Sequence, residues 1–234
     1  RSMAYRFFDD DYNAVFGEDF MKCFDGVNKL IVKPAKNLGG HGIEFFERDS
    51  DGVFMNSNGN VLSLEYLKST FETDFLIQEY FIQSDYISQF NPTSVNTIRM
   101  ITYRDVKTGQ IHILGAVLRI GLKGAVVDNA SAGGGFIGIN EDGKLGNYVF
   151  DKYARKTSFY NDKDFLKTEY IIPNYEQVKQ FAIKVSKRMP HMGLLAHDIV
   201  LDKENIPKLI EINTRCFTEY FLQLTSKPVF DCYT

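Results

Sequence analysis

The stretch HDIVLDKENIPKLIEIN, residues 197–213, decides the fold that the sequence predicts. Two apolar strand patterns flank a short polar segment, and this arrangement predicts an antiparallel hairpin with a four-residue loop. Asp202 then faces Pro207 across the loop, and Asp198 lies directly opposite Glu211. The hairpin therefore brings two carboxylates together on one face of a sheet.

This carboxylate pair has a chemical meaning, because directly opposed residues have Cβ atoms ~4.5–5.5 Å apart and like charges there repel. A divalent cation offsets the repulsion, and Mg²⁺ prefers oxygen ligands from one or two carboxylates. Asn213 lies two residues beyond Glu211 on the same face, so Asp198, Glu211 and Asn213 predict a magnesium site. The alternative is an exposed hairpin with solvated acids. His197 alternates to the opposite face, where we expect a hydrogen-bonded core histidine.

Composition limits the classes of function that remain. The 234 residues suffice for one large domain or two subdomains around a cleft, and the net charge of −3 argues against a nucleic-acid partner. No apolar run approaches the ~20 residues that span a bilayer, so we expect no membrane span. Three cysteines without a CxxC motif favour reduced thiols and a cytoplasmic location. Residues 1–3 have the character of a cloning scar.

A second candidate site lies upstream, where the apolar strand Leu30–Lys33 leads into the glycine-rich loop Pro34–Gly42. A lysine at a strand end can reach a phosphate, and glycines let backbone N–H groups approach phosphate oxygens closely. The order differs from a P-loop, in which the lysine follows the glycines. Alone, the segment fits a glycine-rich hairpin turn equally well; with the acidic pair it favours a nucleotide-phosphate site.

Strand patterns outnumber helical ones along the chain. Strands are predicted over Ile43–Glu47, Val61–Leu64, Asp74–Phe81, Val95–Arg104, Ile111–Ile120, Leu194–Asp202 and Pro207–Asn213. A 3.6-residue stripe predicts a helix over 175–189, with Asn174 and Gln177 as a capping box, and shorter helices precede Phe71 and cover 218–225. The glycine-rich residues 121–135 indicate a surface loop or a ligand lid. Because the strand pairs are antiparallel, the predicted class is α+β.

Two arginines lie on one predicted hairpin. Pairing Arg104 with Ile111 places Arg99 and Arg119 on opposite faces of the sheet, unless a bulge intervenes. Gly115 would allow such a bulge. The sequence leaves both arrangements open.

Five motifs, in this order, resemble the ATP-grasp superfamily: LIVKPAKNLGGHGI (30–43), LIQEYF (76–81), SVNTIRMITYRD (94–105), LRIG with VVDNASAGGGFIGINEDGKL (118–145) and HDIVLDKENIPKLIEINTR (197–215). The VNTIR, LRIG and VDN…GG elements look most like the sugar-transfer-associated branch, which is linked to cell-surface polysaccharide (capsule) synthesis. The resemblance implies two subdomains whose mainly antiparallel sheets grip ATP. They would span 30–80, with the phosphate loop, and 81–234, with the magnesium site, after an N-terminal segment 1–29.

The resemblance also implies roles for residues at matching positions. Lys33 would contact the ATP α/β-phosphates, under a lid formed by Gly39, Gly40, His41 and Gly42. The hinge beside adenine would be Gln78, Glu79, Tyr80 and Phe81; core packing is the alternative for the last two. Asp85 is a ribose candidate or, alternatively, a helix N-terminal residue. Asp198, Glu211 and Asn213 would hold Mg²⁺, in agreement with the hairpin argument.

The arginines and the glycine-rich segment match the family's phosphoryl-transfer region. Arg119 is the preferred catalytic residue, whereas Arg99 matches equally but is also a candidate structural ion-pair former. The resemblance places Asn129, Gly133 and Gly134 near the γ-phosphate and the acceptor. Arg215 would hold a substrate carboxylate, with a surface position at a helix start as the alternative.

The chain also departs from the family. An upstream phosphate-binding lysine has no match, since Lys22 and Lys29 are too close to Lys33, and Val127 replaces an arginine of the glutathione-synthetase-like enzymes. The missing upstream domain and the C-terminal residues indicate a minimal form or a truncated chain.

Three functions follow from the resemblance. The first is an ATP- and Mg²⁺-dependent carboxylate–amine ligase that acts through an acyl phosphate on a small molecule or glycan precursor. The others are a small-molecule kinase and a non-catalytic ATP-binding module of a polysaccharide-assembly complex.

Overall fold

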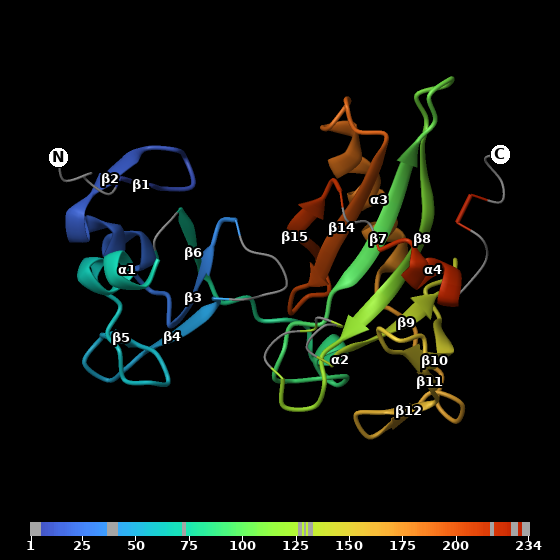
Figure 1. Cartoon of the computed structure of the whole chain (residues 1–234), viewed down its shortest axis with the longest axis horizontal. Coiled ribbons are helices and arrows are strands. Elements are labelled where there is room, and N and C mark those ends of the chain that lie inside the picture. Colours follow the sequence, from blue (N-terminus) through green and yellow to red (C-terminus); the bar gives the residue numbers. More distant parts are fainter. Residues whose placement is uncertain are drawn as a thin grey trace. The chain divides into compact units, whose positions relative to one another are not determined.

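The computed structural model describes residues 6–36, 42–71, 74–125, 128, 130, 133–215, 218–225 and 229–230. The chain divides into unit 1 (Arg1–Tyr80) and unit 2 (Phe81–Thr234), and each unit has its own sheet and core (Figure 1). The strands of both sheets pair antiparallel, which confirms the predicted α+β class. Among helices in the described ranges, none has the length and apolar character needed to cross a membrane.

Unit 1 is built on a four-stranded sheet in the order β5-β4-β3-β6. Its strands are β3 (Lys29–Pro34), β4 (Glu44–Arg48), β5 (Phe54–Met55) and β6 (Phe75–Glu79). One face, with Leu30 and Val32, is buried in a core shared with helix α1 (Leu64–Thr70), the 3₁₀ helix η1 (Gly17–Phe24) and the hairpin of β1 (Arg6–Phe8) and β2 (Ala14–Phe16). Lys33 lies on the other face, because side chains alternate along a strand. We call this second face the outer face of unit 1.

One predicted strand of unit 1 is wrong. Within Val61–Leu64, Val61 makes only an isolated bridge to Met55, and α1 begins at Leu64. Ser63 decides this outcome, because its side chain accepts a hydrogen bond from the Tyr66 backbone N–H at 3.1 Å and so caps the helix. The N-terminal segment contributes Phe20, which is fully buried in the same core.

Unit 2 holds a seven-stranded sheet in the order β11-β10-β9-β8-β7-β14-β15. Its strands are β7 (Ile98–Arg104), β8 (Ile111–Ile120), β9 (Gly135–Ile139), β10 (Leu145–Phe150), β11 (Lys156–Thr157), β14 (Leu194–Leu201) and β15 (Pro207–Asn213). Helix α3 (Tyr175–Lys187) packs on one face, and α4 (Tyr220–Thr225) packs on the face that carries Val117 and Ala196. We call the latter the α4 face. The short elements are α2 (Asp85–Ser88), β12 (Phe159–Tyr160) and β13 (Lys163–Asp164).

The start of α3 corrects a prediction. The helix covers most of the predicted range, but Asn174 has φ 52° and its side chain makes no capping hydrogen bond. Its amide donates instead to the backbone carbonyl of Asn205, at 3.2 Å. The capping box with Gln177 is therefore wrong, because a tertiary contact has replaced the local one.

A β-bulge in β8 decides which face Arg119 occupies. Arg104 pairs with Ile111, as predicted, but the register shifts by one residue next to Gly115. Gly115 has φ +153°, a backbone conformation that favours glycine. The bulge moves Arg119 to the α4 face, where it joins Arg99.

A second bulge, in β15, preserves the acidic pair. Leu201 rather than Asp202 pairs with Pro207, so the loop is one residue longer than predicted. The register then shifts back where β15 has one extra residue, and Asp198 pairs with Glu211 as predicted. The predicted partners are correct, although the loop that led to them is not.

Candidate functional site

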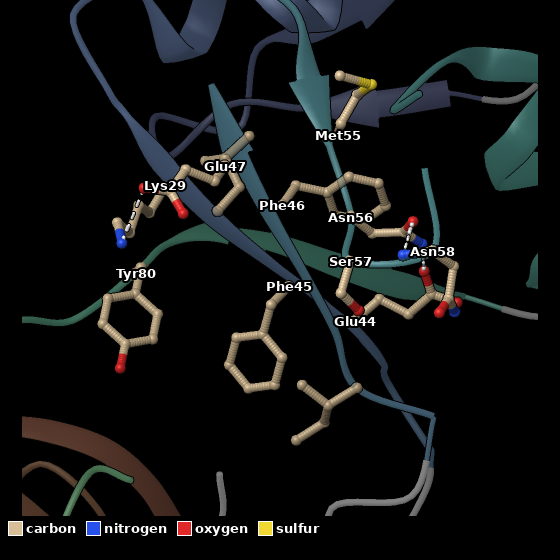
Figure 2. A pocket seen from close by; sticks show the side chains of 12 residues that line it. Lys29, Glu44, Phe45, Phe46, Glu47, Met55, Asn56, Ser57, Asn58 and Tyr80 are labelled. Carbon is tan, nitrogen blue, oxygen red and sulfur yellow. Dashed lines mark hydrogen bonds and ion pairs between the residues drawn. The ribbon is translucent and has the colours of Figure 1, made fainter. Parts of the chain in front are cut away.

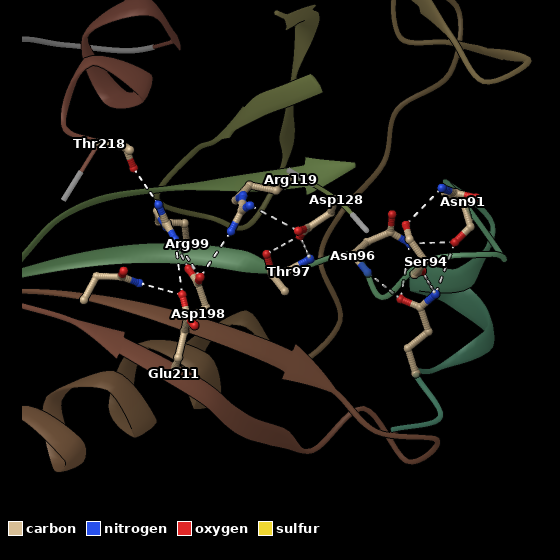
Figure 3. A network of polar contacts seen from close by, with 12 residues as sticks. Asn91, Ser94, Asn96, Thr97, Arg99, Arg119, Asp128, Asp198, Glu211 and Thr218 are labelled. Carbon is tan, nitrogen blue, oxygen red and sulfur yellow. Dashed lines mark hydrogen bonds and ion pairs between the residues drawn. The ribbon is translucent and has the colours of Figure 1, made fainter. Parts of the chain in front are cut away.

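Strands β7, β8 and β14 bring a buried ion-pair cluster together on the α4 face of unit 2 (Figure 3). The guanidinium of Arg99 donates from Nε to Asp198 Oδ1 at 2.7 Å and from Nη2 to Oδ2 at 2.6 Å. Arg119 Nη1 donates to the same Oδ2 at 3.1 Å. Asp198 is only 2% exposed. Two arginines therefore share one buried carboxylate.

The arginines keep Asp198 ionised. Burial alone raises the pKa of this carboxyl group, but the hydrogen bonds from Arg99 and the charge of Arg119 outweigh burial, so the pKa lies below its ordinary value. A third contact fixes Arg99, whose Nη1 donates to the hydroxyl of Thr218 at 2.9 Å. Thr218 directly precedes the turn into α4, and this contact ties that segment to the cluster.

A second carboxylate, Asp128, holds the other end of Arg119. Arg119 Nη2 lies 3.1 Å from Asp128 Oδ1. Asp128 Oδ2 accepts from the backbone N–H of Thr97 at 3.1 Å and also from the Thr97 hydroxyl. Burial dominates here and raises the pKa of Asp128, against the lowering effects of Arg119 and Thr97. Sequence reasoning missed Asp128 and Thr97, although both lie within the VNTIR and VDN motifs.

The predicted magnesium ligands lie at the edge of this cluster. Glu211 pairs with Asp198 across the strands, its side chain is 54% exposed, and its Oε1 is 3.9 Å from Arg99 Nη2. Asn213 Nδ2 donates to Glu211 Oε1 at 3.1 Å. Within the described ranges no three His, Cys, Asp or Glu side chains form a metal-type cluster, so the candidate set is two carboxylates and one amide.

This donor set fits a magnesium ion that also binds substrate phosphates. Mg²⁺ takes one or two carboxylates and completes its octahedron with water or phosphate oxygens. The carboxylate of Glu211 is accessible to an ion. A carboxylate has roughly four acceptor sites, and Asp198 uses three of them for guanidinium N–H groups, so one remains for a metal ion. The three side chains can therefore hold the ion without rebuilding the hairpin.

In unit 1, several predicted nucleotide residues share the outer face. Ile31 pairs with Gln78 on one side and with Phe45 on the other, and Lys33 lies two residues further along β3. The Tyr80 backbone N–H donates to the Lys29 carbonyl at 2.8 Å and so extends the β3–β6 pairing. This face thus combines Lys29 and Lys33 with the side chains of Ile31, Phe45 and Gln78.

Phe45 and Tyr80 also line a groove of about 660 Å³ (Figure 2). Their rings meet edge to face, with centroids 6.1 Å apart. Tyr80 is half-buried, so it is not simply a core residue. Aromatic faces beside a half-open groove suit a planar ring. Phe45 is a third residue that the sequence analysis missed.

The other predicted site residues lie as follows. Gly39, Gly40, His41 and Asn129 lie outside the described residues, whereas Gly42 precedes β4 with φ 74°. Glu79 ends β6, and Phe81 opens unit 2. Asp85 is the exposed first residue of α2, which matches its alternative as a helix N-terminal residue.

The glycine-rich segment and Arg215 lie near the strand ends. The Gly133 carbonyl accepts from the Tyr160 hydroxyl at 3.2 Å, and Gly134 is buried just before β9. Arg215 is exposed after β15, as the surface alternative predicted, but α4 begins five residues later, so Arg215 is not at a helix start.

His197 is a core residue, as predicted. Its Nε2 lies 3.0 Å from the hydroxyls of both Thr102 and Ser186, on the α3 side of the sheet. Burial lowers its pKa to about 4, although the charge of Asp198 acts in the opposite direction. The imidazole is therefore neutral at physiological pH and is not part of the candidate metal site.

Comparison with known proteins identifies a family whose model matches most of the chain. The model of the family described as "Sugar-transfer associated ATP-grasp" matches residues 14–230. Among solved structures, an L-amino acid ligase from Bacillus licheniformis aligns with a TM-score of 0.38 and 15% identity over 90% of this chain. This chain covers 35% of the length of that ligase. No curated protein matches in sequence.

Proposed function

Because the chain belongs to the sugar-transfer associated ATP-grasp family and has its α+β ATP-grasp fold, we propose that it is an ATP- and Mg²⁺-dependent carboxylate–amine ligase. The observation that carries the proposal is the buried Arg99–Asp198–Arg119 cluster beside the accessible carboxylate of Glu211. Guanidinium groups next to a magnesium-type donor set are suited to a phosphoryl group in transfer. We further propose that the enzyme works in the cytoplasm, where ATP is supplied.

In this proposal each group has a defined task. Mg²⁺, when held by Asp198, Glu211 and Asn213, would neutralise charge on phosphate oxygens. Lys33 would bind the α/β-phosphates, and the aromatic groove with Tyr80 would accept the adenine ring. Arg119 and Arg99 would donate hydrogen bonds to the γ-phosphoryl oxygens, whose charge develops in the transition state.

The chemistry requires no nucleophilic side chain. A substrate carboxylate oxygen attacks the γ-phosphorus, the bond to the β,γ-bridging oxygen breaks, and ADP leaves. An amine then attacks the acyl carbon, phosphate leaves, and the amine loses a proton. Positioning and charge stabilisation therefore account for the catalysis. The association with sugar transfer in the family description supports a sugar or glycan precursor as one substrate. We propose that the reaction belongs to cell-surface polysaccharide synthesis.

The first test is binding of Mg·ATP, measured as a thermal shift. A ligand that binds only the native state stabilises it by RT ln(1 + [L]/Kd), or about 2.7 kcal/mol at a hundredfold excess over Kd. We expect a shift for wild type that Glu211→Gln abolishes and EDTA removes. Glu204→Gln, in the exposed loop of the same hairpin, is the matched control and should keep the full shift. No shift for wild type would refute the proposal.

The second test separates reaction types. Wild type is incubated with Mg·ATP and a panel of acids and amines that includes amino sugars and uronic acids, and products are identified by mass spectrometry. A ligase yields ADP, free phosphate and an amide only when both substrates are present. Phosphate on the product would indicate a kinase instead. Binding without any ADP formation would indicate a non-catalytic module.

A further inference from the structure

We propose that Asp128 is a positioning residue for the phosphoryl-transfer reaction: it fixes Arg119 and supplies the negative charge that lets a cation bind beside two arginines. This inference rests on the proposed function and extends it to a residue outside the predicted ligand set. It follows from three features of the cluster in Figure 3, namely its geometry, its charge balance and its burial.

The two arginines are anchored differently. Two nitrogens of Arg99 donate hydrogen bonds to the carboxylate of Asp198, and its third nitrogen donates to the hydroxyl of Thr218. Arg119 uses different nitrogens for two carboxylates, Nη1 for Asp198 and Nη2 for Asp128, each at 3.1 Å. The plane of its guanidinium is therefore fixed at both ends. When Asp198 turns toward a cation, Asp128 still holds Arg119 in place.

Asp128 is itself held rigidly. Its Oδ2 accepts two hydrogen bonds from Thr97, one from the backbone and one from the hydroxyl, while Oδ1 faces Arg119. The residue is 8% exposed. Since Thr97 lies next to the first residue of β7, the carboxylate is attached to the same strand that carries Arg99. A carboxylate fixed on a strand is a precise support for a catalytic arginine.

Charge balance gives Asp128 a second role. Asp198 and Glu211 alone would be neutralised by Arg99 and Arg119, and a cation would then meet a cluster without net charge. When ionised, Asp128 adds a third carboxylate, and the five side chains then carry a net charge of −1. Burial raises the pKa of Asp128, whereas the charge of Arg119 and the hydrogen bonds from Thr97 favour its ionised form. Charges at these separations interact strongly in a poorly solvated site, so this extra charge favours cation binding next to the arginines.

The test is a double-mutant cycle on Arg119 and Asp128. Wild type, Asp128→Asn, Arg119→Gln and the double variant are titrated calorimetrically with a non-hydrolysable ATP analogue, with and without Mg²⁺. Asn keeps the shape of Asp and can still accept from Thr97. We expect Asp128→Asn to weaken Mg²⁺-dependent analogue binding by roughly 10–100-fold, the usual effect of losing a partner of a functional group. In the Arg119→Gln background the same change should have at most a threefold effect.

Stability measurements separate positioning from a merely structural role. Thr97→Val removes one hydrogen bond to Asp128 while retaining volume, and it serves as a comparison for loss of stability in the cluster. Urea unfolding of all variants shows whether each folds. Rescue is tested with Asp128→Glu, which restores the charge and should recover part of the Mg²⁺-dependent binding.

Each outcome has a distinct meaning. If wild type binds no analogue, the proposed function fails, and the positioning role fails with it. If wild type binds and Asp128→Asn binds equally well, Asp128 has no positioning role but the proposed function stands. Equal weakening in both Arg119 backgrounds, in proportion to lost stability, would show that Asp128 is structural only.

Discussion

Buried His197 predicts a specific dependence of stability on pH. Its imidazole is fully buried between β14, β7 and α3, and burial lowers its pKa from 6.5 to about 4. In the unfolded chain the same imidazole takes up a proton near its ordinary pKa. Between these two values the unfolded state binds more protons than the folded state. The stability that the neutral His197 contributes is therefore fully present above the pKa of the unfolded chain. It decreases as the pH falls toward the pKa of the folded protein.

The magnitude follows from the two pKa values. Lowering the pH from about 7.5 to about 5 should reduce the free energy of unfolding by about 2 kcal/mol through His197 alone. Asp198, the neighbouring carboxylate on the opposite face, has a lowered pKa and so stays ionised throughout this window. The contribution of ionised Asp198 to the free energy of unfolding is lost only at lower pH.

The assay is urea unfolding of wild type and His197→Gln at a series of pH values. Gln can hydrogen-bond Thr102 and Ser186 but does not titrate. Groups common to both proteins cancel in the difference, so the variant should show a pH dependence that is weaker by about 2 kcal/mol across the window. The exposed His191, replaced in His191→Gln, controls for the loss of an imidazole. Parallel curves for wild type and His197→Gln would refute the reasoning.

A second measurement covers the case in which the variant does not fold. The proton NMR signal of the His197 ring should stay unchanged from about pH 8 to about pH 5 in wild type, because its pKa lies near 4. A midpoint near 6.5 would show that the imidazole is not buried in a neutral state.

Three further predictions concern packing and charge. Gly115→Ala should lower the free energy of unfolding by about 1–3 kcal/mol, because φ is +153° and the added Cβ would lie 3.1 Å from Leu222. Gly146→Ala, whose added Cβ would lie 3.7 Å from the Gly138 carbonyl oxygen, is the strand control in urea unfolding. Ser63→Ala should cost about 1 kcal/mol in unit 1 through loss of the α1 cap, and unchanged unfolding would contradict that cap. Arg99→Met should cost about 3–5 kcal/mol, since it leaves buried Asp198 with only one arginine, and a melting temperature equal to wild type would contradict the ion-pair argument.

The sequence predicted the elements that local pattern determines. The strands around Lys33, the two arginine-bearing strands and the C-terminal hairpin follow from alternation and turn residues, and all are present. Asp198 and Glu211 face each other as predicted, although the loop is one residue longer than predicted and the extra residue of β15 restores the pairing. These features depend on residues close together in the chain.

What sequence could not determine depends on distant contacts. The predicted cap of α3 is absent because the Asn174 side chain donates a hydrogen bond to the carbonyl of Asn205, in the C-terminal hairpin loop. Asp128 was missed because only the fold brings its side chain beside Arg119, nine residues earlier, and beside Thr97, which lies in another motif. The extra residue of β15 has no local signal, whereas Gly115 at least indicated where β8 could bulge.

Each of the two bulges also divides its hairpin into two segments, and the register of strand pairing differs between the two segments. The strands pair in one register on the loop side of each bulge, and in a register shifted by one residue on the side of Arg119 or Asp198. A one-residue insertion in the loops at 105–110 or 202–206 can be absorbed by moving or removing the bulge, with the functional side chains still on the α4 face. The same insertion between the bulge and the functional residue would turn that residue to the opposite face. The protein should therefore tolerate a one-residue insertion on the loop side of a bulge far better than an insertion on the other side of the same bulge.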